Sequence, residues 1–373
     1  MIFSRKLIRL SKSCIGNKEK IAVRRVLNKE FLGLGEEVKD FEEELTKFFG
    51  RPAICVVNGT ASLHLAIQGC GIKYGDEVLV QSLTYLASIQ AISAANAVPI
   101  FCEINPKNCS IDLKDAEKKL TKNTKAIMPV HYAGGAGVLD EVYDFANKNK
   151  LRVIEDCAHA FGSFYKNKLI GSFGDISCFS FDGIKNITSG EGGCIVSNDK
   201  EFIQKVKDSR LLGVLRDSEK RYKGKRSWDF DVENQGWRYH MSNIMAAIGR
   251  EQLKKFEKFK YKRQLFAQEY ISRLKEIEGI KLLELDYKNI VMHIFPILVQ
   301  KDRDYIRESL LKKGIQTGIH YLPNHYLSFY KKEINDSLPI TEEIYPKLLT
   351  LPLHPDLSLR DIKFVSEQLI NLL

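Results

Sequence analysis

Short apolar runs recur along the first half of the chain, and several of them show no alternation with polar residues. They occupy residues 53–57, 77–81, 98–102, 125–130, 151–155, 175–179 and 193–197. Uninterrupted apolar runs of this length are typical of strands covered on both faces. Helical patterns lie between the early runs, at 60–71, 83–96, 112–120 and 139–150. The alternation predicts βαβ units in an α/β fold with a mainly parallel sheet, and one antiparallel edge because no helix separates the last two runs.

The pattern changes after residue 197. Helical patterns at 200–212, 242–277, 302–313 and 359–373 enclose a single strand candidate at 291–299, and residues 216–226 form a charged, turn-prone insertion. A chain of 373 residues is too long for one ordinary core. We therefore expect a large α/β domain over residues 1–249, whose N-terminal segment packs on the second domain, and a small α+β domain over residues 250–373.

Charge and composition exclude several classes of protein. The formal net charge is +10, but the 57 Lys and Arg residues interleave with 47 Asp and Glu residues, and no nucleic-acid motif is recognisable. We therefore expect a solvated basic surface and no nucleic-acid partner. The N-terminus carries charges where a signal peptide has an apolar core, and no run has the length of a membrane span. These features predict a cytoplasmic protein without a membrane partner.

Eight cysteines contribute no Cys-x-x-Cys pair, and most of them lie inside apolar runs. This distribution indicates small core residues in a reducing compartment. Cys157 and His159 could be imagined as metal ligands, but no second pair of ligands lies near them in the sequence. Since a structural metal normally needs such a set, we expect no metal site.

Polar residues follow several of the predicted strands. In open parallel sheets, ligands collect at the carboxyl ends of the strands, and helix N-termini there bind phosphate. Gly59 would permit close backbone approach, and the amides of Thr60 and Ala61 would face an anion. Thr60 and Ser62 would supply hydroxyls. An ordinary capped helix start is the alternative. Tyr85, after the second run, would stack on a flat ring or belong to the core.

Asp156 directly follows the fifth run, at the end of the predicted strand, and Lys185 follows the sixth. Pyridoxal phosphate needs both groups, an amine for its Schiff base and a carboxylate for its ring nitrogen. A buried Asp156 would need a cation, and a protonated pyridine nitrogen is one. His159 would contact the cofactor ring or its 3′ oxygen, unless it is an ordinary core or surface histidine. Ser180 would donate to the phosphate, and Glu191 is assigned no chemistry.

Six motifs follow one another in the chain: Asn58-Gly-Thr-Ala-Ser62, Ser82-Leu-Thr-Tyr85, Ile154-Glu-Asp-Cys-Ala-His-Ala160, Ser180-Phe-x-x-x-Lys185, Gly190-Glu-Gly-Gly193 and Tyr239-His-Met-Ser-Asn-Ile-x-Ala-Ala-Ile-Gly249. Over nearly the whole chain they resemble the motif set of the DegT/DnrJ/EryC1/StrS aminotransferases, fold-type I pyridoxal-phosphate enzymes that act mainly on nucleotide-linked keto-sugars. The resemblance implies a seven-stranded sheet in the large domain.

The resemblance also assigns roles to residues. It implies that Lys185 is the Schiff-base lysine, that Asp156 is the partner of the pyridinium nitrogen, and that Tyr85 stacks on the ring. Gly59, Thr60 and Ser180 become phosphate ligands. Members that dehydrate their substrate carry histidine at the lysine position, so the retained lysine favours ordinary transamination.

Two positions depart from the family pattern. Arg238 stands where the family has an asparagine that reaches the neighbouring subunit's cofactor phosphate, and His240 replaces an arginine on the substrate side. The resemblance implies a homodimer in which the insertion before Arg238 crosses to the partner. His320, Tyr321 and His325 lie in a loop that the resemblance places over the substrate, although a solvent-exposed turn is the alternative.

We therefore expect a pyridoxal-phosphate-dependent aminotransferase that moves an amino group, from glutamate, to a keto group of a nucleotide-linked sugar. Such an activity would serve amino-sugar and surface polysaccharide biosynthesis. One alternative is the same transamination on a cyclitol or another small phosphorylated ketone. Another is a catalytically idle homologue that only binds the cofactor.

Overall fold

A computed structural model of the protein describes residues 7–226, 228–331 and 337–373. Its centre is a seven-stranded sheet with the order β1 (Ala53–Val56), β9 (Gly193–Ser197), β8 (Ile176–Ser180), β5 (Arg152–Asp156), β4 (Thr124–Met128), β2 (Glu77–Gln81) and β3 (Val98–Cys102). Only β9 runs against the other strands, because it pairs antiparallel with both β1 and β8. The mainly parallel sheet is confirmed. The antiparallel strand lies one position inside the edge.

Successive residues of the strands point to opposite faces of this sheet, and both faces are covered by helices. On β1, Ile54 and Val56 belong to a hydrophobic cluster with α3 (Gly59–Gly69), α4 (Leu86–Ala94) and α7 (Lys200–Ser209). Ala53 and Cys55 belong to a second cluster, with α2 (Glu36–Phe49), α5 (Leu113–Lys118) and α6 (Leu139–Asn149). This two-sided burial explains why the strands are continuous apolar runs in the sequence.

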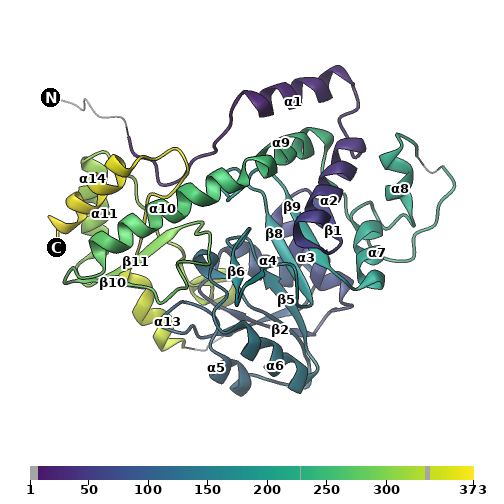
Figure 1. The fold of residues 1–373 in the computed structure, drawn as a ribbon. Helices are drawn as coiled ribbons and strands as arrows, with labels where there is room; N and C mark the ends of the chain where they lie inside the picture. Colours follow the sequence, from purple (N-terminus) through teal and green to yellow (C-terminus); the bar gives the residue numbers. More distant parts are fainter. Residues whose placement is uncertain (1–6, 227, 332–336) are drawn as a thin grey trace.

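The C-terminal region has its own sheet and its own hydrophobic cluster. Its three antiparallel strands are β10 (Ile280–Leu282), β11 (Phe295–Val299) and β12 (Leu348–Leu351). Helices α10 (Phe256–Leu274), α11 (Arg303–Lys312) and α14 (Leu359–Ile370) cover it (Figure 1). Ile8 joins this cluster, and it forms a parallel bridge with Ile315. The N-terminal segment therefore packs on the C-terminal strands.

The remaining elements are short or peripheral. They are α1 (Asn17–Asn28), α8 (Asp217–Tyr222), α9 (Asn243–Lys254), α12 (Ser328–Lys331), α13 (Pro339–Ile344), the hairpin of β6 (Phe164–Tyr165) and β7 (Lys168–Leu169), and three 3₁₀ turns at Tyr132–Gly134, Asn324–Tyr326 and Tyr345–Lys347. None of the helices in the described ranges has the length and hydropathy that a membrane span requires.

Several element predictions need correction. The predicted long helix over 242–277 is two helices that meet at Lys255, whose Nζ contacts the Glu19 carboxylate. The break lets α9 pack on α1 and α2 while α10 packs on α14. The expected division between residues 249 and 250 falls inside α9, and we propose that the two units divide at Lys255 instead.

Contacts between distant segments also decide where other helices and strands form, begin and end. The charged insertion at 216–226 contains the helix α8, which lies at the end of the molecule opposite α14 (Figure 1). The strand predicted over 291–299 begins only at Phe295. The helix predicted from residue 83 begins at Leu86, because the Asn324 side chain holds the carbonyls of Ser82 and Thr84 in a loop. Strands β10 and β12 and helices α1 and α2 were not predicted.

Candidate active site

A cavity of about 490 Å³ opens where the strands of the large sheet end. Residues that directly follow β1, β2, β5 and β8 line it, and the C-terminal region contributes the rest of the wall. The carboxyl ends of parallel strands meet at one edge of a sheet, so this is the place where such folds bind ligands. The cavity therefore collects side chains that lie far apart in the sequence.

Lys185 reaches into this cavity from the loop after β8. Its backbone amide donates to the carbonyl of Asp182 at 3.1 Å, and its Nζ lies 3.4 Å from Nε2 of His293. Part of the side chain is open to the cavity, and the surrounding atoms reduce the hydration of its amine. This burial lowers the pKa of the Lys185 amine to about 8, against the opposing attraction of Asp156 and Asp182. The uncharged share of the amine near neutral pH is therefore much larger than that of an ordinary lysine, whose pKa is about 10.4.

Asp156 is the last residue of β5, and only 5% of it is exposed. The hydroxyl of Ser88 donates to its Oδ2 at 2.7 Å, and the amide of Ala158 donates to its Oδ1 at 3.0 Å. Within the described ranges no cationic side chain forms an ion pair with it. A buried carboxylate in this situation favours a cationic ligand.

The segment after β1 is packed tightly against the end of β8. A Cβ atom on Gly59 would lie 2.8 Å from Cβ of Ser180, so glycine permits this close approach. Gly59, Thr60 and Ser180 all line the cavity. Ala61 does not act as expected, because its amide donates to the Asn58 side chain at 2.8 Å and caps α3. The hydroxyl of Ser62 is likewise used inside the helix, where it donates to the carbonyl of Gly59.

Three histidines and two tyrosines also line the cavity. His159 shares a 2.9 Å hydrogen bond with the hydroxyl of Tyr321, whose ring lies 5.6 Å from that of Tyr85. The rings of His159 and His293 are 4.6 Å apart. Burial lowers the pKa of His159 and His293 well below the usual value and that of His320 to about 4. All three imidazoles are therefore neutral at physiological pH.

Besides Ala61, three predicted site residues do not line this cavity in their own chain. His325 is wrong as a rim residue: its ring is buried, with Nδ1 2.7 Å from the Ser82 hydroxyl and Nε2 3.3 Å from Glu342. His240 forms a backbone bridge with Val56 but does not line the cavity. Arg238 is exposed on the strand-like segment beside Leu211.

Other cavity residues were missed by the sequence analysis. His293 lay unnoticed inside the apolar run at 291–299, and Ser88 inside a helical pattern. Glu191, to which no role was given, lines the cavity, and burial raises the pKa of its carboxyl. A lone histidine in an apolar segment was the one signal available for His293. Without knowledge of the fold, this signal does not tell whether the histidine belongs to the core or to the site.

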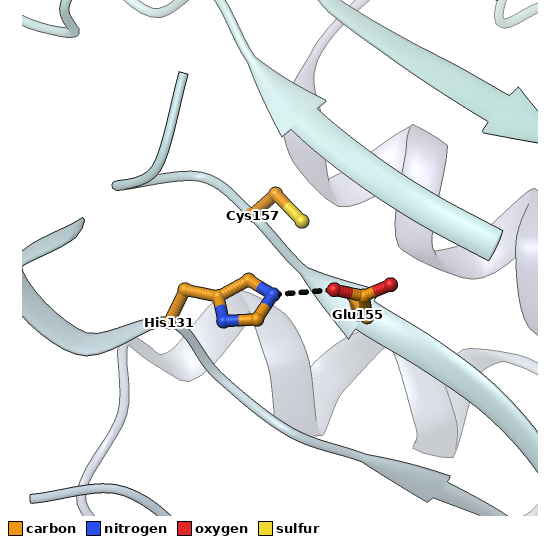
Figure 2. A group of neighbouring side chains, drawn as sticks. All are labelled: His131, Glu155 and Cys157. Atoms are coloured by element: carbon orange, nitrogen blue, oxygen red, sulfur yellow. Dashed lines mark hydrogen bonds and ion pairs between the residues drawn. The ribbon is translucent and has the colours of Figure 1, made fainter. Parts of the chain in front are cut away.

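A second buried polar group lies behind the cavity, on the other face of β5. Figure 2 shows His131 pointing at Glu155, with Cys157 beside them, and their ligand atoms lie within 4.8 Å of one another. His131 Nε2 lies 2.7 Å from the Glu155 carboxylate, which also accepts the hydroxyl of Tyr143 at 2.7 Å and that of Ser177 at 3.3 Å. The carboxylate is thus already satisfied by protein donors.

The fold and this cavity define a fold-type I enzyme with a buried lysine and a buried carboxylate at one sheet edge. The sequence model of the DegT/DnrJ/EryC1/StrS aminotransferase family matches residues 13–370. The chain belongs to this family and is an aminotransferase.

Relatives of named activity agree with this assignment. The chain is 36% identical over 362 residues to a UDP-4-amino-4,6-dideoxy-N-acetyl-beta-L-altrosamine transaminase of Campylobacter jejuni, covering 94% of each chain. It is 32% identical to the spore coat polysaccharide biosynthesis protein SpsC of Bacillus subtilis, covering 95% of this chain and 94% of the relative. Its fold matches that of Helicobacter pylori PseC, an aminotransferase involved in the biosynthesis of pseudoaminic acid. That match has a TM-score of 0.90 and 29% identity, over 98% of this chain and 99% of the other.

Enzymes of this family use pyridoxal phosphate, and so does this protein. The cavity fits that cofactor on three counts. It holds an amine whose pKa is lowered by burial, a buried carboxylate without an ion-pair partner among the described residues, and a glycine–serine contact at a helix N-terminus. Nδ1 of His159 is buried without a partner in the described structure, so this ring retains unused hydrogen-bonding capacity beside the cavity.

We predict that Gly59→Ala weakens the binding of pyridoxal phosphate by about tenfold, because overpacking of this kind costs about 1–3 kcal/mol. The new methyl group would push Ser180 away from the end of β8. Titration of the apoenzyme with the cofactor, followed by absorbance, measures the effect. Gly33→Ala is the matched control, since a Cβ there meets no atom within 4 Å. Equal affinity in both variants would contradict the proposed packing.

Proposed function

We propose that this aminotransferase moves an amino group from glutamate to a keto group of a nucleotide-linked sugar. The observation that carries the proposal is the meeting of Lys185 and Asp156 in one cavity, under a wall of uncharged polar rings. The relatives whose names specify a UDP-linked sugar or polysaccharide biosynthesis support the substrate class. Neutral rings suit an uncharged sugar, which is recognised by hydrogen bonds and by stacking on aromatic faces.

Each cavity residue has a role under this proposal. Lys185 attaches the cofactor covalently and, when released, carries a proton to or from the reacting substrate carbon through its Nζ. Asp156 stays anionic and keeps the ring nitrogen protonated. Bound pyridoxal phosphate then supplies the electron sink for that carbon. The helix start at Gly59 and Thr60 holds the phosphate together with Ser180.

The aromatic residues orient the ligands. Tyr85 lies at the mouth of the cavity, where it would cover one face of the ring. His159, held by the hydroxyl of Tyr321, would face the ring oxygen. His320 and Tyr321 would contact the sugar. We withdraw His325 from the substrate contacts, because its ring is occupied by Ser82 and Glu342.

We predict that borohydride reduction of the cofactor-loaded protein adds the cofactor mass to the peptide containing Lys185. The Lys185→Ala variant should bind pyridoxal phosphate only noncovalently and lose at least about 10²–10⁴-fold in transamination rate, the usual contribution of a positioned acid–base group. Lys200→Ala, at an exposed position on α7, is the matched control. A label on another lysine would refute the assignment.

The substrate class is tested by separating the two half-reactions. Glutamate should convert the bound cofactor to its amine form, and a panel of nucleotide-linked keto-sugars should convert it back, both followed by absorbance. We predict that His320→Ala slows the sugar half-reaction about tenfold, the effect of losing one hydrogen bond of about 1.4 kcal/mol, and spares the glutamate half-reaction.

His325→Ala is the matched control for His320→Ala. It should lower the melting temperature, because the buried Ser82 hydroxyl loses its partner, while the ratio of the two half-reactions stays unchanged. An equal loss of rate in both half-reactions of the His320→Ala variant would contradict the proposed contact of His320 with the sugar. Conversion by a keto-cyclitol and by none of the nucleotide sugars would replace the proposed substrate class.

We also propose that the enzyme is a homodimer, with the segment from α8 to Arg238 directed at the partner's cavity. In support, this segment exposes large apolar side chains: Trp228 is 87% exposed, Phe230 56% and Val232 45%. Exposed apolar groups clustered in this way are typical of an interface. Arg238 would then complete the phosphate site of the other subunit.

Subunit mixing tests this arrangement. We predict that Lys185→Ala and Arg238→Ala proteins, each of low activity, recover activity when they are unfolded together and refolded. Random pairing gives about half mixed dimers, and in each of these one cavity has both its own lysine and the partner's arginine. Active monomers in sedimentation, or no recovery in dimers shown to be mixed, would contradict the proposal.

A further inference from the structure

Arg263 lies in α10, directly behind the cavity, and its burial is unusual. Only 1% of the residue is exposed. Its Nη1 donates to the carbonyls of Met292 at 3.1 Å, His293 at 3.1 Å and Leu353 at 3.2 Å, and its Nε is buried without a partner. Within the described ranges no carboxylate forms an ion pair with it. Burying a guanidinium without a counter-ion costs free energy, so the buried position of Arg263 needs an explanation.

The groups around Arg263 do not neutralise it. Burial raises the pKa of the Cys14 thiol to about 11, so no thiolate is present near neutral pH. Burial lowers the pKa of His354 to about 4, so this ring is neutral as well. The nearby carboxylate of Asp356 forms an ion pair with Lys12. The charge of Arg263 therefore acts on the surrounding protein without a matching anion.

The charge also persists over the pH range in which the enzyme would work. Burial lowers the pKa of Arg263 to about 10, which is still above that of Lys185, at about 8. A nearby positive charge disfavours protonation of other groups. Arg263 lowers the pKa of both His293 and Lys185 in this way, in addition to the larger effect of burial.

The geometry connects Arg263 to the reacting amine through one residue. The guanidinium holds the carbonyl of His293, and the imidazole of the same residue lies 3.4 Å from the amine of Lys185. We propose that Arg263 is a positioning residue of the active site: its unpaired charge disfavours protonation of the Lys185 amine, and its hold on the backbone of His293 fixes the ring that orients this amine. The inference rests on the proposed role of Lys185 as the residue that attaches the cofactor.

Other groups act on Lys185 in the opposite direction or not at all. Asp156 from β5 and Asp182 from the loop after β8 favour its charged form. Glu191, across the cavity, carries a carboxyl whose pKa is raised by burial. The remaining titratable groups that line the cavity are three neutral imidazoles, two phenols and a thiol whose pKa is raised by burial: His159, His293, His320, Tyr85, Tyr321 and Cys178. Arg263 is thus the one described cation that opposes the two aspartates.

The test measures the attachment of pyridoxal phosphate to the apoenzyme as a function of pH, and uses no turnover. The cofactor is mixed with full-length apoprotein, borohydride is added after a fixed short time, and mass spectrometry quantifies the labelled Lys185 peptide. Only the uncharged amine reacts, so the rate follows its titration. We expect the wild-type midpoint near pH 8, as the lowered pKa of Lys185 indicates.

Three substitutions of Arg263 separate charge from packing. Arg263→Gln and Arg263→Met remove the charge and should move the midpoint upward by about one pH unit, which reduces labelling at neutral pH about tenfold. Arg263→Lys keeps the charge and should restore the wild-type midpoint, although it loses some of the carbonyl contacts. Arg273→Gln is the control on the same helix, because Arg273 pairs with Glu269 and does not line the cavity.

The outcomes are distinct. An unchanged midpoint in a folded Arg263→Gln or Arg263→Met protein, or an equal shift in Arg263→Lys, overturns the electrostatic role. His293→Leu tests whether the ring of His293 orients the amine, and it leaves Arg263 unaltered. This substitution should slow labelling at every pH and leave the midpoint in place. An unchanged rate overturns the orienting role. A wild-type midpoint near the ordinary lysine value overturns the proposal even if no Arg263 variant folds. A label on another lysine refutes the proposed function itself.

Discussion

The removal of one lysine amine from bulk water is the constraint around which this site is built. Water would keep Lys185 protonated, and a direct ion pair with a carboxylate would do the same, since both favour the charged form. In the structure, burial disfavours the charged form of Lys185, and no carboxylate of the described residues forms an ion pair with it. Asp156 is occupied by the Ser88 hydroxyl and the Ala158 amide, and the amine lies 3.4 Å from Nε2 of the neutral His293 imidazole. The amine can therefore act as a nucleophile near neutral pH.

The same strand end separates two acidic groups that have different tasks. Glu155 and Asp156 are consecutive in β5, so their side chains point to opposite faces of the sheet. Glu155 is enclosed by His131, Tyr143 and Ser177, and the backbone amide of His131 also donates to the carbonyl of Asp156 at 3.0 Å. The network on the closed face thus fixes the backbone from which Asp156 enters the cavity.

The sequence was sufficient for the large sheet and for the residues at its strand ends. Strands buried on both faces are continuous apolar runs, and β2, β3 and β9 have the predicted bounds. A glycine, a carboxylate and a lysine that each follow such a run must meet at one edge, which is why Gly59, Asp156 and Lys185 share the cavity.

What the sequence did not reveal depends on contacts between distant segments. Lys255 has no helix-breaking chemistry, and α9 ends there because the two helices pack on different neighbours. His293 precedes a buried strand and has the local context of a core residue. His325 follows a proline in a polar loop and has the local context of a surface residue, yet Ser82 from the large domain encloses it. In each case the deciding partner lies on another unit of the fold.

This dependence has a consequence for how the site is completed. The large sheet supplies the amine, the carboxylate and the helix start, but His293, His320 and Tyr321 come from the C-terminal region. Without that region the amine would face solvent and the carboxylate would attract it as a charged pair. Docking of the C-terminal sheet and α10 on the strand ends adds His293, His320 and Tyr321 to the wall of the cavity and places Arg263 behind His293. The chemistry of Lys185 is therefore a property of the two packed units together, although its sequence motif belongs to the large one alone.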